Sequence, residues 1–292
     1  MRIKINIIII VCLVITVITH AQEPLVNNQS FNENNPEFNQ EKLNGKQGSS
    51  MVNRVYTRAT SYGIGLTSLQ DTYLSPENYK GWEARLSRET MHQTHLIQGK
   101  VWQQTYFQGN FGYTNNRVEN NKTATALANW NYGWFYRQPL TPRFDVLLGG
   151  AADLNGGFTY NMRNGNNPVS IRAYGSIDAS VIALWNLELN QRPLLLRYQA
   201  NLPLIGLMFM PHYGQSYYEI FSVGEHGGTI KCVTPFSTPS LRQMFSADYP
   251  FGKLTLRFTY VWDAQQANLN QIKSHIYSHI FMIGVVKRFQ RL

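Results

Sequence analysis

Three residues in one aromatic stretch, His212, Ser216 and Glu219, carry the side chains of a serine hydrolase. A histidine base would take the proton of the serine hydroxyl, while the carboxylate would orient the imidazole. The chain has no Gly-x-Ser-x-Gly motif, and the His-x-Ser pattern of membrane-embedded lipid hydrolases is also missing. We therefore favour a packed loop whose polar groups bond one another, with a barrel-embedded lipid hydrolase as an alternative.

The stretch 207–221 is far more apolar and aromatic than a solvated loop, and it lies in the longest predicted connection, 204–239. Connections of this length without regular structure are usually functional or disordered, and this composition argues against disorder. We expect the segment to fold over or into the mouth of its domain. The ligand-binding candidates are its tyrosines, Tyr213, Tyr217 and Tyr218.

His275 and His279 are four residues apart and would share one face of a strand, an arrangement that could bind a metal ion. Phe281 continues the same face, which indicates an apolar outer surface instead. No carboxylate pair, cysteine cluster or phosphate-binding glycine loop stands out. The sequence therefore predicts no metal and no cofactor.

In the segments that must position these residues, apolar and polar residues alternate with a period of two, as in β-strands. In 123–136, one set of alternate positions is apolar and ends in aromatic residues, whereas the other is mostly small and polar. Such segments, about ten residues long, are typical of strands that cross a bilayer with one face to lipid and one to the lumen. The ten predicted strands are 61–69, 81–90, 100–113, 123–137, 143–154, 169–189, 194–203, 240–249, 254–263 and 275–289.

The connections between these strands alternate in length. The tight ones, 138–142, 190–193 and 250–253, are rich in proline or glycine, whereas 155–168, 204–239 and 264–274 are long. With both chain ends in the periplasm, the tight connections fall on the periplasmic side and the long ones outside the cell, as outer-membrane barrels prefer. The nine-residue connection 91–99 is the exception.

A soluble β-sandwich would also alternate. Here the apolar faces carry tryptophan and tyrosine at their ends, which is where membrane interfaces place these residues. The sequence therefore predicts an all-β fold, a transmembrane antiparallel up-and-down β-barrel of about ten strands that follows a flexible N-terminal leader.

The polar faces would direct a balanced set of arginines and carboxylates into the lumen. Unpaired charge in a confined space is costly, so equal numbers indicate mutual pairing. A barrel of about ten strands is narrow, little wider than the eight-stranded kind that side chains fill. We expect a filled core, with a charged conduit as the alternative. The predicted network comprises Glu83, Arg85, Asp145, Asp153, Arg172, Asp178, Arg197, Arg242, Asp248 and Arg257, with Asp263 and Arg288 on the same faces.

The first residues have the features of a secretory signal peptide: basic residues, the apolar run 7–18, and small residues before a cut after Ala21. The expected organisation is a signal peptide at 1–21, a flexible Asn-rich periplasmic leader at 22–58 and an outer-membrane barrel at 59–292. Cleavage would remove Cys12 and leave Cys232 alone, so no intramolecular disulfide is expected.

The chain carries 26 Lys and Arg against 17 Asp and Glu. These basic residues are scattered rather than clustered, and export also argues against a nucleic-acid partner. Expected partners are outer-membrane lipid or lipopolysaccharide, the barrel-assembly machinery and other envelope proteins.

The run 71–82, with Arg85, Arg88 and Glu89 after it, resembles an uncharacterised Bacteroides-type family of exported outer-membrane barrels, DUF3316. The aromatic loop 213–219 and the ending 285–289 are also similar to that family. The resemblance covers about 58–292 and implies a single domain in the outer membrane of a Gram-negative bacterium. Because the family's function is unknown, the resemblance implies no catalytic residues.

Together these patterns predict a non-enzymatic barrel that binds at the cell surface or assists an envelope complex, with the aromatic loop as its contact surface. A narrow channel for a small or amphipathic solute is the second hypothesis, and the lipid hydrolase is the third.

Overall fold

Strands make up nearly all of the chain that the computed structural model describes, residues 54–252 and 254–291. The predicted signal peptide and most of the predicted leader lie outside these residues. Within them, no helix is long and apolar enough to cross a membrane. The elements in chain order are β1 (Arg54–Asp71), β2 (Ser75–Gln93), η3 (Leu96–Gly99), β3 (Val101–Asn116), β4 (Lys122–Thr141), β5 (Phe144–Asn161), β6 (Val169–Leu189), β7 (Arg192–Phe209), η4 (Glu219–Val223), β8 (Ile230–Val233), β9 (Leu241–Phe251), β10 (Leu254–Leu269) and β11 (Ile272–Arg291).

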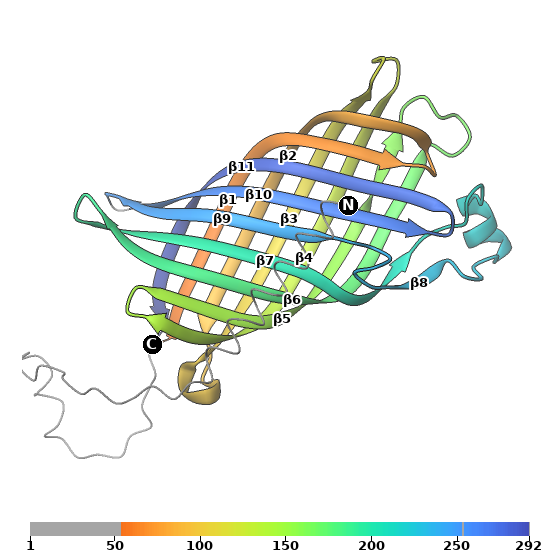
Figure 1. Cartoon of the computed structure of the whole chain (residues 1–292). Helices are drawn as coiled ribbons and strands as arrows, with labels where there is room; N and C mark the ends of the chain where they lie inside the picture. Colours follow the sequence, from red (N-terminus) through yellow and green to blue (C-terminus); the bar gives the residue numbers. More distant parts are fainter. Residues whose placement is uncertain (1–53, 253, 292) are drawn as a thin grey trace, which may run out of the picture. The chain divides into compact units, whose positions relative to one another are not determined.

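Ten of these strands form a closed ring in which each strand pairs with two antiparallel neighbours (Figure 1). The ring runs β1 to β7 in chain order, continues through β9, β10 and β11, and closes where β11 pairs along the whole of β1. The predicted all-β, ten-stranded antiparallel barrel is confirmed. Closure leaves no strand of the ring with a fully unpaired edge, so most of the backbone of the wall is hydrogen-bonded to neighbouring strands.

The strands are longer than the alternation indicated. β1 begins at Arg54, inside the segment assigned to the leader, and β5 and β10 extend through residues predicted as long loops. The expectation of long connections at 155–168 and 264–274 is wrong. The second of these is a two-residue turn at Asn270 and Gln271, both with positive φ, as the tightest hairpin turns require.

The two ends of the barrel differ. We call the end where β1 begins and β11 finishes the terminal end, and the opposite end the loop end. The loop end carries the one long connection that remains, 210–240, in which η4 and the short strand β8 are set. β8 pairs with the last residues of β7, from Gly206 to Phe209, and thereby lengthens the wall beyond β9 (Figure 1).

Along most of each strand, side chains alternate between the two faces of the wall. Outward positions in the middle of β1 and β11 carry exposed apolar side chains, with relative exposures of 71% for Leu66, 62% for Ile64 and 69% for Phe281. Their inward neighbours are buried, including Thr67 on β1 and Ser278 on β11, whose hydroxyls bond each other at 3.1 Å. The barrel is therefore apolar outside and polar inside, the reverse of a soluble protein.

Candidate functional site

The interior of the barrel is filled by polar and charged side chains. The ten residues of the predicted network are all described, as is Asp263, and each has a relative exposure of 9% or less. A buried charge is costly unless it is paired and hydrogen-bonded. The contacts of these side chains therefore decide what the interior can do.

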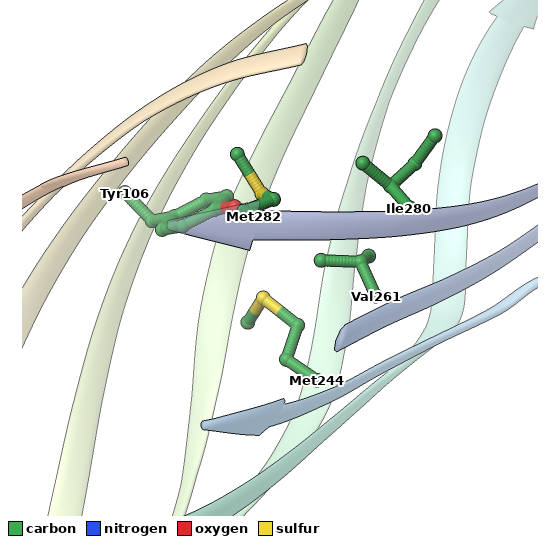
Figure 2. Close-up of a cluster of buried hydrophobic side chains, with 5 residues drawn as sticks. All are labelled: Tyr106, Met244, Val261, Ile280 and Met282. Carbon is green, nitrogen blue, oxygen red and sulfur yellow. The ribbon is translucent and has the colours of Figure 1, made fainter. Parts of the chain in front are cut away.

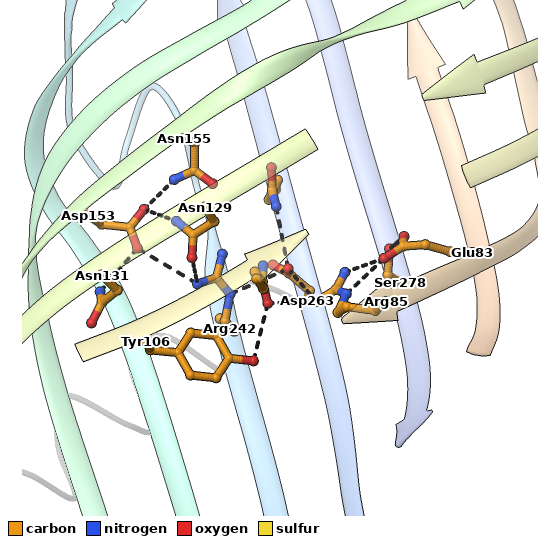
Figure 3. Close-up of polar contacts among 12 residues, drawn as sticks. Glu83, Arg85, Tyr106, Asn129, Asn131, Asp153, Asn155, Arg242, Asp263 and Ser278 are labelled. Atoms are coloured by element: carbon orange, nitrogen blue, oxygen red, sulfur yellow. Dashed lines mark hydrogen bonds and ion pairs between the residues drawn. The ribbon is translucent and has the colours of Figure 1, made fainter. Parts of the chain in front are cut away.

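A first group of charges lies toward the loop end (Figure 3). Arg85 on β2 donates to Glu83 Oε1 from Nη2 at 2.6 Å and from Nε at 2.8 Å, and its Nη1 donates to Asp263 Oδ2 at 3.1 Å. Arg242 on β9 reaches the same Asp263 oxygen at 3.4 Å and donates to Asn129 Oδ1 at 2.8 Å. We call this group the loop-side cluster: Glu83, Arg85, Asn129, Asp153, Arg242 and Asp263.

A second group, nearer the terminal end, is centred on Glu89 of β2. Arg197 Nη1 lies 2.6 Å from Glu89 Oε1, and Arg257 Nη1 donates to Glu89 Oε2. Gln104 Nε2 donates to Glu89 Oε1 at 2.6 Å. Arg257 also holds Asp248 with two parallel bonds of 2.6 and 2.8 Å, the fork geometry that guanidinium and carboxylate favour. We call Glu89, Gln104, Arg197, Asp248 and Arg257 the terminal-side cluster.

Apolar layers separate and cap these clusters. The layer between them is Tyr106, Met244, Val261, Ile280 and Met282, drawn together in Figure 2. The terminal end is closed by Met91, Phe135, Leu147 and Ile182, and the loop end by Met208, Met210, Val233, Ala267 and Ile272. Among the described residues, charged and apolar layers thus alternate along the axis.

Three predicted lumen residues have other partners. Arg172 donates to Gln265 at 3.3 Å and to Ser274 at 3.1 Å, and Asp178 accepts the Ser176 hydroxyl at 2.6 Å. Asp145 pairs at 2.7 Å with Arg137, whose side chain is 40% exposed at the terminal end. The side chain of Arg288 lies outside the described part of the chain.

Glu89 was not among the predicted lumen residues. It nevertheless forms ion pairs with two arginines, Arg197 and Arg257, whereas the predicted carboxylate of the same cluster, Asp248, pairs with Arg257 alone. Glu89 lies on the same parity of β2 as Glu83 and Arg85, and that parity was the available signal. Four amide side chains that hydrogen-bond to these charged residues or to one another were missed as well, because a neutral amide adds nothing to a charge pattern: Gln104, Gln108, Asn129 and Gln199.

Small cavities remain between the side chains. One of about 20 Å³ adjoins the terminal-side cluster and is lined by Glu89, Arg197 and Arg257 among others. Two more, also of about 20 Å³ each, lie at the loop-side half and share Pro203 and Ser240 as lining residues. Each has room for about one water molecule.

The backbone pairing of β7 with its neighbours is interrupted beside these last two cavities. The β7–β9 ladder ends at the pair Asn201 and Arg242, and the β7–β8 ladder begins at Gly206. Residues 202–205 of β7 therefore lack a ladder partner on that side, and Pro203 has no N–H to donate. On the β6 side the register shifts beside Asp178.

The long connection holds the hydrolase candidates in a different arrangement from a catalytic triad. Glu219 Oε2 accepts the backbone N–H of Ser216 at 2.7 Å, and the Ser216 hydroxyl accepts the backbone N–H of Glu219 at 3.2 Å. This reciprocal pair is a capping box for the helical turn that begins at Tyr217 and continues into η4. His212 is bonded instead to the Gly227 carbonyl, at 3.1 Å from Nε2.

The three candidate tyrosines separate into two kinds. Tyr213 and Tyr218 are 66% and 71% exposed. Tyr217 is half-buried: its hydroxyl accepts the Ile171 N–H at 2.7 Å, and its ring stacks on Phe221 at 6.2 Å. Burial raises the pKa of the Tyr217 hydroxyl, so this anchor stays protonated at neutral pH.

The histidine pair lies on the outer wall. His279 is exposed and bonds the Tyr260 hydroxyl at 2.7 Å through Nδ1, and His275 stacks on Tyr277 at 4.6 Å. Across residues 54–252 and 254–291, no group of three or more histidine, cysteine, aspartate or glutamate side chains could hold a metal ion.

A family model described as "Protein of unknown function (DUF3316)" matches residues 7–292. No curated protein matches the chain. Similar solved structures include the transport unit of the autotransporter AIDA-I from Escherichia coli, with 8% identity, 86% of this chain and 94% of that chain covered, and a TM-score of 0.47. The outer membrane protease OmpT from Escherichia coli has 6% identity, coverage of 81% and 97%, and a TM-score of 0.42. The translocator domain of the autotransporter NalP from Neisseria meningitidis has 11% identity, coverage of 84% and 90%, and a TM-score of 0.36. At these values the similarities transfer no activity to this chain.

Proposed function

The chain belongs to the DUF3316 family of unknown function, and we propose that it is an outer-membrane β-barrel that binds at its extracellular end and does not conduct solute. The membrane setting is supported by the wall itself. Its outer face is a belt of exposed apolar side chains with Trp82, Trp130, Trp134 and Trp185 among them. Exposed tryptophan on a closed barrel suits a membrane interface and is costly in water.

The observation that carries the proposal is the filled lumen. Two charged clusters and several groups of buried apolar side chains occupy it, and the described cavities within it have a volume of about 20 Å³ each. A conducting pore needs a continuous wet path, whereas these clusters satisfy their charges by bonding each other. The interior therefore acts as a core that supports the wall.

With the interior closed, the loop end becomes the surface available for binding. In the orientation that places the chain ends in the periplasm, this end lies outside the cell. The connection 210–240 is ordered by its capping box and by the Tyr217 anchor, yet it presents Tyr213, Tyr218 and Phe236, the last 90% exposed. Rigid exposed aromatic side chains bind at low entropic cost. We propose lipopolysaccharide or another envelope protein as the partner, after insertion by the barrel-assembly machinery.

Two measurements test this proposal. Purified protein in a planar bilayer should give no steady single-channel current in potassium chloride. In intact cells, a photoreactive benzoylphenylalanine at Tyr213 or Tyr218 should form a discrete adduct that the same group at Phe281 on the outer wall does not form. A steady current would overturn the closed-barrel reading, and identical adduct patterns at the three positions would overturn the binding surface.

The break in the wall at 202–205 favours a second candidate, lateral passage of a small amphipathic solute. Two cavities lie behind that break, and Ser240 lines both. Lateral passage would be supported if the protein allowed solute flux into vesicles and the Ser240→Trp variant abolished that flux. Flux that is absent, or that is insensitive to this substitution, would leave binding as the function.

A further inference from the structure

A continuous apolar strip rises along the outer face of β6, β7 and β8. The register pairs Ile177 with Ile205 and then Leu207 with Cys232. Phe209 pairs with Ile230 at the top of the strip. The exposed fractions are 55% for Ile177, 56% for Ile205, 59% for Leu207 and 65% for Ile230. The strip has no charged outward side chain at these positions.

The segment η4 extends the strip past the end of the strands. The Phe221 ring stacks on Phe209 at 6.1 Å with an interplanar angle of 20°, while Tyr217 stacks on Phe209 at 6.5 Å. Tyr73 Oη donates to the Gln215 carbonyl at 2.9 Å, which ties the start of the segment to the β1–β2 turn. Phe221 nevertheless remains 67% exposed and Val223 56% exposed. η4 is thus fixed in place with apolar side chains uncovered.

The height of the strip can be compared with the thickness of the apolar belt. Starting from Trp185 near the terminal end of β6, a band of ~25 Å on a strand tilted by ~40° spans about ten residues. That band ends near Gly175, which pairs with Leu207. Phe209, Ile230 and η4 therefore lie at or just above the outer boundary of the belt.

The wall across the barrel ends its apolar surface earlier. On β1, the outward residues beyond Leu66 are Ser68 and Gln70, and they pair with Lys80 and Asn78 of β2. Polar side chains at this level are what a barrel presents to headgroups and water. The contrast shows that the strip is a local extension of the lipid-facing surface, continuous with it and of the same chemistry.

We propose that η4 and the strip lie against the acyl chains of outer-leaflet lipid, so that this part of the long connection is a membrane foot and not a free extracellular loop. Leu207, Ile230 and Phe221 are the contact residues. Apolar side chains at the boundary of a bilayer gain by burial in it, as interfacial helices do. The inference rests on the membrane placement proposed above but needs no surface partner.

Cys232 provides a native probe, because it is exposed and lies within the strip. Protein that begins after residue 21 carries no other cysteine. We would attach a nitroxide to Cys232 in phosphatidylcholine vesicles and compare its collision with oxygen, which partitions into lipid, and with a water-soluble nickel chelate. The reference variants, in a Cys232→Ser background, are Phe281→Cys on the belt and Tyr213→Cys on the long connection.

The expected result is an oxygen-to-nickel ratio at Cys232 close to that at Phe281→Cys and well above that at Tyr213→Cys. Replacing Phe221 by serine should shift the Cys232 ratio toward the Tyr213→Cys value, with the barrel still folded by its heat-dependent gel shift. A Cys232 ratio equal to that of Tyr213→Cys would overturn the foot while leaving the membrane barrel intact. A water-like ratio at Phe281→Cys as well would instead overturn the membrane placement.

Discussion

Replacing Glu89 by glutamine tests whether the terminal-side cluster is held by charge balance. In the native cluster, Glu89 and Asp248 face Arg197 and Arg257, two negative charges against two positive. After the substitution, Arg257 keeps its two bonds to Asp248, whereas Arg197 keeps only the neutral Gln199 oxygen at 2.5 Å. One buried guanidinium thus loses its carboxylate.

The size of the effect follows from burial. The side chains of Arg197 and Glu89 are each 7% exposed, so solvent screens their pair weakly. Removing one partner of a buried pair costs about 3–5 kcal/mol, because the other charge stays desolvated. The adjacent cavity of about 20 Å³ can admit one water to the orphaned guanidinium. We therefore expect Glu89→Gln to lower the free energy of unfolding by about 3 kcal/mol, the lower end of that range.

The assay is equilibrium urea unfolding in phosphatidylcholine vesicles, with the folded fraction read from the heat-dependent gel shift. Arg137→Gln is the matched control, since it breaks an ion pair of 2.7 Å whose arginine is 40% exposed. The arginine of this pair reaches solvent but the Asp145 side chain is only 8% exposed, so we expect a cost above the ~0–1 kcal/mol of a surface pair and below that of Glu89→Gln. The double variant Glu89→Gln with Arg197→Gln restores neutrality and should recover much of the loss. If Glu89→Gln cost no more than Arg137→Gln, or if the double variant recovered nothing, the charge-balance reasoning would be refuted.

Three further outcomes are expected. Gly149→Ala should block folding, because a Cβ there would lie 1.9 Å from the Trp134 carbonyl oxygen, whereas Gly109→Ala meets nothing within 4 Å and should fold normally in the same gel assay. Tyr217→Phe should speed amide exchange in the long connection, because it leaves a backbone N–H of β6 without its acceptor at a cost of about 1–3 kcal/mol. Burial raises the pKa of Tyr217 above its ordinary value of 10.0, so this protection should be constant below about pH 10 and decline above it. Ser216→Ala should speed amide exchange in 219–223, because it removes a cap worth about 1 kcal/mol, and Glu219→Ala should have the same effect. Neither variant should change hydrolysis of phospholipid. If Ser216→Ala abolished such hydrolysis, the result would instead support an enzyme.

The barrel could be predicted from the sequence because its two environments differ at every second residue. The alternation located all ten ring strands, although it ended several of them too early. β10 illustrates the reason: beyond Asp263 its residues include Ala264, Gln265, Gln266 and Ala267, which no longer contrast between faces, yet the strand continues to Leu269. Outside the apolar belt both faces of a strand can be polar, so the sequence no longer needs to alternate. The hydrogen-bonded pairing of the strands continues there nevertheless.

The candidate site was less predictable because its contacts join distant parts of the chain. Parity placed Arg257 in the lumen, but its bond to Glu89 crosses 168 positions of sequence and depends on closure of the ring. β8 was not predicted either, because its four residues form a strand only by pairing with the end of β7. The reciprocal bonds of Ser216 and Glu219 agree with the packed loop of mutually bonded polar groups that the sequence favoured over a hydrolase site.

The charged interior also bears on how the barrel closes in one register. A shift of one residue between strands exchanges the inner and outer faces, and an apolar lumen would tolerate that exchange because the outer wall is apolar as well. Here Glu89 on β2 must meet Arg197 on β7 and Arg257 on β10, three strands of which none are neighbours. A slipped register would turn these charges toward lipid, where they are costly. Apolar residues of equal volume could match the stability of such a cluster. We therefore infer that the terminal-side cluster contributes to specificity, because its charges are paired with one another only when the barrel closes in the correct register.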